Sequence, residues 1–403
     1  QTLVVQDGVA FLDGERQEKP PFNVLQESLD AHPRATVSGL PPFQGGWAGY
    51  ISYDYGRYLE PKARIPAFQP LCPDMVFHRF DTVVAIDHLQ ERAWIIAAQA
   101  RDADVLETRL HHRQSRLDGT PVTGLAATIS RATHESNVEH TVGYILAGDI
   151  FQANITQTFA APVPAGFDAF TLYGNLRHRN PATFACLLDY DGIQVISSSP
   201  ERLVRFDGRT AEARPIKGTR PRDADPMRDQ GLMMELQASR KDRAENVMIV
   251  DLLRNDLSRV SQPGTVKVPV LCGLESYANV HHLVSVVQGD LKPENTVTDL
   301  LAAVFPGGSI TGAPKIRAME IIAELEQAPR GVYCGSIGYL GFNGCCDFNI
   351  AIRTVQVAGG TVRVQGGGGI TARSQAGAEY EESLTKIARL RAALRDGSAG
   401  GAA

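Results

Sequence analysis

Two pairs of acidic residues have the spacing that metal ligands adopt on helices. Asp242 and Glu245 are three positions apart, and so are Glu379 and Glu382. Residues at this spacing project from one face of a helix, so each pair presents two carboxylates together. If the two faces meet, four carboxylates need a cation, and Mg²⁺ prefers such hard oxygen ligands. The alternative is two solvated helix faces, on which acids at this spacing are common.

A lysine and a glutamate could act as nucleophile and proton donor. Lys217 stands between Ile216 and Gly218, and burial there would lower its pKa and free its amine to attack. Glu201 follows a serine-rich stretch and precedes Lys217 in the sequence. The number of residues between Glu201 and Lys217 is compatible with neighbouring strands of one sheet. On these residues alone, the more ordinary interpretation is a surface lysine in a basic turn and an acid paired with Arg202.

Two glycine-containing segments could hold an anion through their backbone. The first is a run of consecutive glycines, Gly366, Gly367, Gly368 and Gly369. Glycine leaves backbone N–H groups open to a carboxylate or phosphate, and a bulge or tight turn is the alternative. The second, residues 305–315 with Thr311, puts glycines and hydroxyl groups just before a predicted helix, whose N-terminus favours anions.

Arg353 and two adjacent histidines extend this set. Arg353 is expected on the polar strand face that also carries Asp347. There it could clamp a substrate carboxylate, or it could form a structural ion pair with Asp347. His281 and His282 point to opposite faces of a strand, so we expect at most one to be functional. The set suits an enzyme for a small, multiply anionic substrate with a divalent cation.

The elements that must position these groups indicate an α+β fold with large antiparallel sheets, packed face to face and flanked by helices. Residues 1–125 form a β-rich section, 126–396 the catalytic region, and 397–403 a flexible tail. We expect a helix over 239–256 with Ala244, Val247, Met248 and Leu252 on its inner face. Strands are expected on both sides of Pro200 and over 332–340, 347–355 and 361–365, and further helices over 139–147, 313–327 and 376–395.

Composition excludes several classes of function. The chain has 403 residues, a net charge of −5 and no basic run, so no nucleic-acid partner is expected. No apolar stretch approaches the roughly 20 residues that span a bilayer, and we do not expect the first residues to act as a signal peptide. The six cysteines show no metal-binding spacing. A cytoplasmic protein with reduced thiols is expected.

Several ordered motifs resemble those of the chorismate-utilising enzymes. This family includes component I of anthranilate synthase and of aminodeoxychorismate synthase, isochorismate synthase and salicylate synthase. The motifs cover most of the catalytic region, with weaker similarity before it. They are SPER (199–202), PIKGTRPR (215–222), DRAENVMIVDLLRND (242–256), HHLVS (281–285), FPGGSITGAPK (305–315), YCGSIGY (333–339), IRT (352–354) and EYEES (379–383).

The resemblance implies a role for each matching residue. Glu245 and Glu382 match the glutamates that hold Mg²⁺, which in turn holds the ring carboxylate of chorismate. Asp242 and Glu379 match acids that act through metal-bound water. Glu201 matches the general acid for the departing C4 hydroxyl. The matches to substrate-binding groups are Arg353, Tyr333 and the glycine run for the pyruvyl carboxylate, and His282 and Thr311 for other contacts.

Two positions choose a branch within the family. Isochorismate and salicylate synthases have a lysine base where this chain has Gln152, and a glutamine cannot deprotonate water. Anthranilate synthases typically have alanine where this chain has Lys217. A lysine at this position resembles the branch of the family that aminates chorismate at C4. In that branch, the lysine amine adds covalently at C2. Production of anthranilate and a non-catalytic regulatory role are the alternatives.

The chain also departs from the family pattern. Arg373 stands where members usually have an acid. The first strands of the fold are expected to be truncated at the N-terminus. The sequence contains no glutamine amidotransferase module, so the resemblance implies a separate amidotransferase subunit that supplies ammonia.

Overall fold

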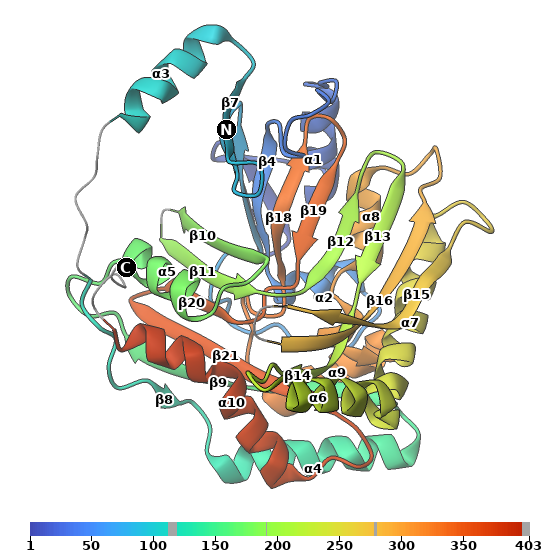
Figure 1. The fold of residues 1–403 in the computed structure, drawn as a ribbon. Helices are drawn as coiled ribbons and strands as arrows, with labels where there is room; N and C mark the ends of the chain where they lie inside the picture. Colours follow the sequence, from blue (N-terminus) through green and yellow to red (C-terminus); the bar gives the residue numbers. More distant parts are fainter. Residues whose placement is uncertain (112–118, 191, 278–279, 397–403) are drawn as a thin grey trace.

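The computed structural model describes residues 1–111, 119–190, 192–277 and 280–396. Its larger sheet has neighbouring strands antiparallel and includes strands from both ends of the chain (Figure 1). The strands of this sheet lie in the order β14 (Ile216–Pro221), β16 (Val280–Asp290), β13 (Thr210–Arg214), β12 (Arg202–Phe206), β19 (Cys346–Asn349), β18 (Ser336–Gly341), β4 (Gly46–Ile51), β5 (Met75–Phe80), β1 (Thr2–Gln6), β2 (Val9–Leu12) and β3 (Glu15–Arg16). One more strand, β15 (Lys267–Ser276), also pairs with β16.

The second sheet is also antiparallel and lies across the first. β8 (Ala126–Ala127) pairs with β9 beside the main order, and β6 (Thr82–Asp87) and β7 (Arg92–Ala97) form a separate hairpin. The main order is β10 (Phe184–Tyr190), β11 (Ile193–Ser199), β20 (Thr354–Ala358), β21 (Thr361–Ile370), β9 (Gln152–Pro162) and β17 (Gly312–Ala313).

The two sheets pack face to face through one apolar cluster. Tyr50 and Val76 of the larger sheet contact Val195 and Ala358 of the second in this cluster. Burial of these side chains removes apolar surface from water and fixes the sheets against each other. The predicted α+β class, with large antiparallel sheets flanked by helices, is therefore confirmed.

Helices cover the outer faces of both sheets. α1, α7 and α8 share the core of the larger sheet, α5 and α10 cover the second, and α4 and α9 pack on β9. The helices are α1 (Pro21–Asp30), α2 (Gly56–Leu59), α3 (Ala100–Leu110), α4 (Arg131–Ala147), α5 (Ala169–Arg179), α6 (Pro226–Ala238), α7 (Arg240–Val260), α8 (Val297–Val304), α9 (Lys315–Glu326) and α10 (Ala376–Leu394), with short 3₁₀ turns η1 (Tyr53–Tyr55) and η2 (Gly308–Ile310).

The chain crosses from one sheet to the other at two adjacent places. β11 leads into β12 through Pro200 and Glu201, and β19 leads into β20 through residues 350–353. Backbone hydrogen bonds join the crossings: the Ile350 N–H donates to the Glu201 carbonyl at 2.9 Å, and the Ser198 N–H donates to the Arg353 carbonyl at 3.0 Å. This paired crossing brings residues from both sheets to one point.

The crossing corrects the prediction of a single strand over 347–355. β19 ends at Asn349, β20 begins at Thr354, and Arg353 between them has a φ of 54°. The strands on both sides of Pro200 were predicted correctly, but they belong to different sheets. Apolar alternation continues through both crossings because each chain segment remains buried, so the pattern does not mark the change of sheet.

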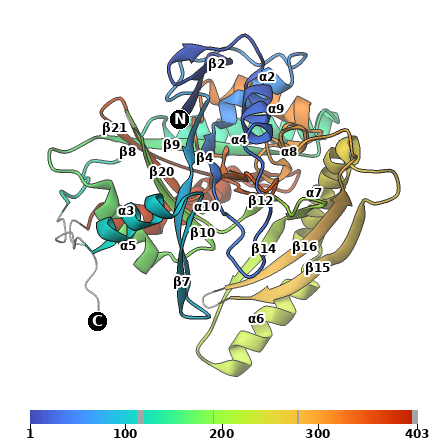
Figure 2. The same cartoon turned by 90° about the horizontal axis from the view of Figure 1, so that it is seen from above.

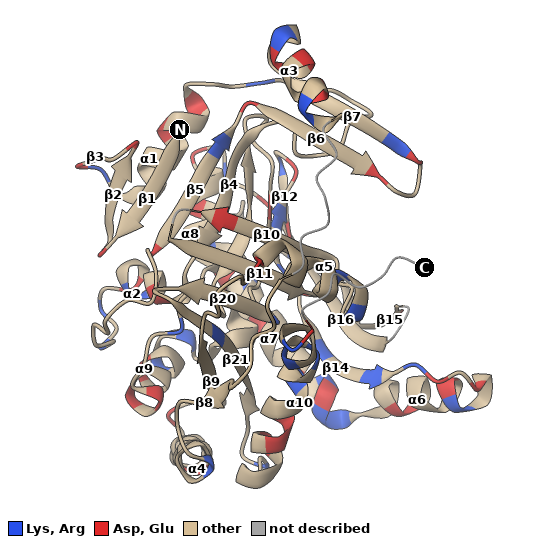
Figure 3. Cartoon of the chain, turned by 90° about the vertical axis from the view of Figure 1, so that its left-hand side faces the viewer, with Lys and Arg blue, Asp and Glu red and all other residues tan. Residues whose placement is uncertain are grey.

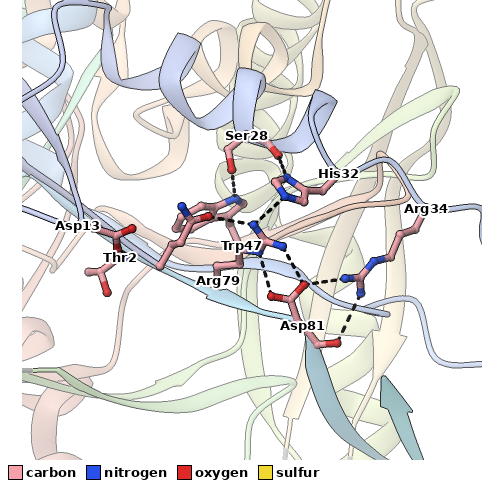
Figure 4. Close-up of polar contacts among 9 residues, drawn as sticks. Thr2, Asp13, Ser28, His32, Arg34, Trp47, Arg79 and Asp81 are labelled. Carbon is pink, nitrogen blue, oxygen red and sulfur yellow. Dashed lines mark hydrogen bonds and ion pairs between the residues drawn. The ribbon is translucent and has the colours of Figure 1, made fainter. Parts of the chain in front are cut away.

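The N-terminal section joins the larger sheet directly, because β4 pairs with β18. The boundary predicted near residue 125 therefore does not separate two sheets. Arg79 of β5 links the sheet to the segment that follows α1: its guanidinium contacts Asp81 at 3.0 Å and the His32 ring at 3.0 Å (Figure 4). Trp47, which is fully buried, donates from Nε1 to the Ser28 hydroxyl at 3.1 Å.

α7 is present as predicted, but its buried face differs. The predicted inner residue Val247 is exposed, whereas Ile249, Val250 and Leu253 are buried. The reason is a buried amide: Asn246 is completely buried and donates to the Leu283 carbonyl of β16 at 3.2 Å. A search for apolar residues at helical spacing does not identify this face, because the residue at its centre is polar.

The outer helices carry mixed charge. α6 and α7 lie beside β14, β15 and β16 (Figure 2), and Lys and Arg stand beside Asp and Glu along α6 (Figure 3). Within the described part of the chain, every helix is too short or too polar to cross a bilayer.

Candidate active site

Lys217 lies on β14 opposite Leu283, where the register of β14 against β16 shifts. The shift occurs at Gly218, whose φ is +80°. A Cβ at Gly218 would lie 2.8 Å from the Cβ of Asp242, so only glycine lets the start of α7 approach this closely. α7 begins with Ser239, whose hydroxyl accepts from the Asp242 N–H at 3.2 Å. Local backbone geometry thus brings the first acidic pair to the lysine.

The lysine is held as a weak base. Burial lowers the pKa of Lys217, and the carboxylates of Glu245 and Glu201 only partly oppose this. Lys386 of α10 lowers the pKa further, because a second ammonium disfavours protonation nearby. A lysine with this pKa shift has a larger fraction of neutral, nucleophilic amine than one in water.

Glu201 lies on the first crossing and is 7% exposed. Its Oε1 has no hydrogen-bond partner among the described residues. Burial raises the pKa of Glu201, while Lys217, Ser309 and the backbone of Ile216 act in the opposite direction. The net shift favours the protonated acid, which is the form that can donate a proton.

Arg353 lies on the second crossing, beside Glu201. Its guanidinium donates to the Lys386 carbonyl of α10, and burial lowers its pKa. The alternative of an Arg353–Asp347 ion pair is wrong, because Asp347 pairs instead with Arg202 at 2.8 and 3.0 Å. With φ positive, Arg353 has left the strand that carries Asp347. Its charge remains directed to the site.

Tyr333 is close to Arg353. It is 6% exposed, and burial raises the pKa of its hydroxyl well above the ordinary value. The two side chains interact electrostatically, since Tyr333 acts on the pKa of Arg353. A neutral hydroxyl beside a guanidinium provides two adjacent donors for one carboxylate.

The glycine run is a regular part of β21, so the alternative of a bulge or tight turn is wrong. Gly366, Gly367, Gly368 and Gly369 pair in unbroken register with residues 157–154 of β9. β20 pairs with β21 only as far as Val364, which leaves the opposite edge of the run outside the sheet. On β9, the N–H groups of Thr156 and Asn154 donate elsewhere, so Gly367 and Gly369 point their own N–H groups to that open edge.

The glycines also admit α10. A Cβ at Gly366 would lie 2.7 Å from Ile387, and one at Gly368 would lie 3.1 Å from Glu379 and 3.4 Å from Glu382. Close packing is therefore a second reason for the run. It brings the second acidic pair against the strand with the open N–H groups.

Gln152 and Thr311 line the other end of the run. Gln152 is 1% exposed, its amide has no partner among the described residues, and a Cβ at Gly369 would lie 2.2 Å from its Nε2. Thr311 is completely buried, and its hydroxyl donates to the Gly307 carbonyl at 2.9 Å. The Asn154 N–H donates to the Thr311 carbonyl at 2.8 Å, which ties η2 to β9.

The two histidines differ in their surroundings. His282 Nδ1 lies 2.8 Å from the Thr219 hydroxyl, and burial lowers its pKa, so the neutral ring is favoured. His281 is completely buried and lies 2.7 Å from Ser276 and 2.9 Å from Asp229. The Gly218 backbone and Arg353 both act on the pKa of His282, so this histidine lies near the site residues.

The acidic pairs face each other across the site, with lysines between them. Burial raises the pKa of Glu245 and of Glu379. Burial would also raise that of Glu382, but Lys386, whose Nζ is 2.7 Å away, holds it below its usual value. Among the described residues, no three histidine, cysteine or acidic side chains are grouped closely enough to hold a metal ion as they stand.

The donor set nevertheless fits a hard divalent cation. Each acid offers carboxylate oxygens, and Glu382 and Asp242 both raise the pKa of Glu245, which indicates negative charge that is incompletely compensated. Asp242 contacts Arg220 at 3.4 Å, and Glu379 accepts from Ser374 at 2.6 Å.

Sequence reasoning missed Lys386. Its Nζ donates to the Gly367 carbonyl at 2.8 Å as well as contacting Glu382. A signal was present, because Lys386 follows Glu382 by four residues, the spacing of a helical ion pair. Arg373 is exposed between β21 and α10.

These features define a class: a two-sheet α+β enzyme whose acid, weakly basic amine and anion-binding groups suit a small anionic substrate. The model of the chorismate binding enzyme family matches residues 4–392. The chain therefore belongs to the chorismate binding enzyme family, and it is a chorismate-utilising enzyme.

Known relatives extend over nearly the whole chain. Anthranilate synthase component 1 of Thermus thermophilus is 41% identical over 99% of this chain and 88% of its own. Aminodeoxychorismate synthase component 1 of Escherichia coli is 40% identical over 92% of this chain and 82% of its own. The crystal structure of anthranilate synthase component I from Streptococcus pneumoniae superimposes with a TM-score of 0.87 at 32% identity, covering 97% of this chain and 89% of that one.

Proposed function

We propose that this protein is component I of an aminodeoxychorismate synthase, which converts chorismate and ammonia to 4-amino-4-deoxychorismate. The observation that carries the proposal is a lysine of lowered pKa, Lys217, held beside a glutamate of raised pKa, Glu201. The resemblance to the family places alanine at this position in anthranilate synthases, so an amine here favours C4 amination.

The pair supports a covalent route of two balanced displacements. The neutral Lys217 amine attacks C2, the ring double bonds shift, and the C4–O bond breaks as Glu201 protonates the departing hydroxyl to water. Ammonia then attacks C4, the double bonds shift back, and the C2–N bond breaks to release Lys217. The ammonium group that forms on C4 then loses a proton to the Glu201 carboxylate, which restores the acid. The two steps together replace one difficult displacement at C4 with two easier ones.

The surrounding groups would orient the substrate. Arg353 and Tyr333 are suited to the pyruvyl carboxylate, which they would hold by charge and hydrogen bonds. The open N–H groups of Gly367 and Gly369 are suited to an anionic oxygen beside α10. The same edge faces the neutral amide of Gln152, which cannot serve as a base for water.

A divalent cation is part of the proposal. Glu245 and Glu382 would hold Mg²⁺, with Asp242 and Glu379 acting through its water ligands. When bound, the ion would offset the charge of the ring carboxylate. Ammonia would come from a glutamine amidotransferase subunit, because relatives named component 1 imply a second component.

The decisive experiment identifies the product. The protein is incubated with chorismate, Mg²⁺ and ammonium, and the product is analysed by mass spectrometry before and after an aminodeoxychorismate lyase is added. Formation of 4-aminobenzoate only after the lyase supports the proposal. Fluorescent anthranilate formed without lyase would refute it.

Anthranilate synthase component I is the second candidate. It is favoured by the T. thermophilus relative, whose identity to this chain matches that of the aminodeoxychorismate synthases. A non-catalytic regulatory role would be indicated if chorismate bound without being consumed at high ammonium.

A further inference from the structure

A hollow outside the chorismate site lies between η1, α2, the segment over residues 61–74 and α9. Its empty space, counted to its open mouth, is about 540 Å³. The walls are mainly apolar and include Ile65, Phe68, Met319 and Ile322. Such a pocket excludes water from part of any ligand that enters it.

Three polar side chains line this hollow with unused hydrogen-bonding capacity. Tyr53 is 8% exposed, and its hydroxyl has no partner among the described residues. The same holds for Arg57 Nε. Within the part of the chain that the structure describes, Asp54 accepts only backbone bonds, from the N–H groups of Arg330 at 3.1 Å and Gly331 at 2.8 Å. Each Asp54 oxygen therefore retains a free lone pair.

The charges of the lining favour a cation. Arg330 and Glu326 form a closed pair at 2.7 and 2.9 Å and cancel each other. Arg57 offsets Asp74, whose pKa it lowers, so Asp54 leaves one excess negative charge among the lining residues. Burial raises the pKa of Asp54 to about 6, so its carboxyl is mostly ionised at neutral pH and lacks a side-chain partner of its own.

We propose that this hollow is a second binding site, for a small primary amine with an apolar body. The ammonium group donates to Asp54 and to the Tyr53 hydroxyl, and the body packs against Phe68 and Met319. This inference does not rest on the proposed function. A buried hydroxyl without a partner costs stability unless a ligand satisfies it, and an ammonium does so.

The hollow is connected to the chorismate site through Arg330. Its guanidinium donates to the carbonyls of Ile310 at 3.0 Å and Asn154 at 2.6 Å. Ile310 precedes Thr311, and Asn154 pairs with Gly369. An amine on the free lone pairs of Asp54 shares this carboxylate with the backbone N–H groups of Arg330 and Gly331 and weakens their hydrogen bonds. Its binding is therefore expected to shift the KM for chorismate.

Calorimetry with a charge-matched series tests the site. Benzylamine is compared with benzyl alcohol and benzoate at pH 7.5. We expect the amine to bind with 1:1 stoichiometry and at least tenfold more tightly than either analogue. This difference in affinity corresponds to about the value of one charged hydrogen bond. Asp54→Asn is expected to weaken the amine about tenfold or more. Tyr53→Phe is expected to weaken it less while leaving Tm unchanged or higher.

Further variants keep the test decisive if Asp54→Asn fails to fold. Phe68→Ala removes a wall without touching backbone bonds and is expected to weaken the amine about tenfold. Phe170→Ala, at a residue 64% exposed on α5, is the matched control and should bind as the wild type does. Equal binding of the three probes, tighter binding of benzoate, or unchanged affinity in Phe68→Ala would overturn the proposal.

Discussion

Replacing Lys217 with methionine separates the charge of the lysine from its length. Methionine is unbranched and fills similar space but carries no amine. If the amine forms the covalent adduct at C2, C4 amination should fall about 10³-fold or more, because methionine has no nucleophile and Lys386 is engaged by Glu382 and the Gly367 carbonyl. The same substitution also tests the electrostatics, since it removes the buried ammonium.

Lys217→Met is expected to lower the activity but to raise the stability of the folded protein. The folded protein holds the pKa of Lys217 below its usual 10.5, chiefly because of burial. The unfolded chain keeps the usual pKa and binds the proton more tightly, so below that value the lysine favours unfolding. Lys217→Met should therefore be more stable at pH 7 by about 1 kcal/mol, or about 1–2 °C in Tm for a chain of this size. The difference should vanish as the pH rises toward 10.5.

Two measurements check this reasoning: product formation by mass spectrometry, and thermal unfolding between pH 7 and 10. Lys19→Met is the matched control, because Lys19 is 61% exposed and pairs with Glu27 at the surface. It should alter neither rate nor Tm. Undiminished amination by Lys217→Met would remove the covalent step from the mechanism. A lower Tm at pH 7 would show that attraction to Glu201 and Glu245 outweighs burial.

Three further substitutions address the rest of the site. Glu201→Gln should lower kcat/KM about 10²–10⁴-fold, and should abolish the wild-type loss of activity as pH rises through the raised pKa of Glu201; an unchanged pH–rate profile would contradict its role as acid. Arg353→Lys should raise the chorismate KM about 10–100-fold with a smaller effect on kcat, because lysine cannot bind a carboxylate in bidentate fashion; equal KM values in steady-state kinetics would argue against the clamp. Gly368→Ala places a methyl group 3.1 Å from Glu379 and 3.3 Å from Lys386, so the Mg²⁺ concentration for half-maximal activity should rise about tenfold; an unaltered Mg²⁺ titration would separate these acids from metal binding.

The fold was largely predictable because its signals are local. The strand predicted over 361–365, which lies in β21, alternates Val362 and Val364 with polar residues, and α4 ends at Gly148, whose φ is +86°. The change of sheet at Asn349 was not predictable, because pairing partners lie far apart in the sequence. A strand that continues in one sheet and a chain that crosses to another have the same residue pattern.

The site was predictable in its members but not in their contacts. The glycine run suggested an anion cradle, but the close approach of α10 depends on helix packing that no local pattern records. Arg353 was expected on the same strand face as Asp347, whereas Arg202 of β12 pairs with Asp347 instead. Lys386 was overlooked because an ion pair along a helix is ordinary until its Nζ is seen to reach the Gly367 carbonyl.

The paired crossing has a consequence for motion. Glu201 and Arg353 occupy two chain segments that are hydrogen-bonded to each other where the layers exchange strands. Sliding of one sheet past the other would carry both groups as a single unit and preserve their separation. Lys217, on β14, and the acids of α7 and α10 lie outside this unit. A shear between the layers would therefore alter the distance from nucleophile to proton donor while leaving proton donor and carboxylate clamp in register.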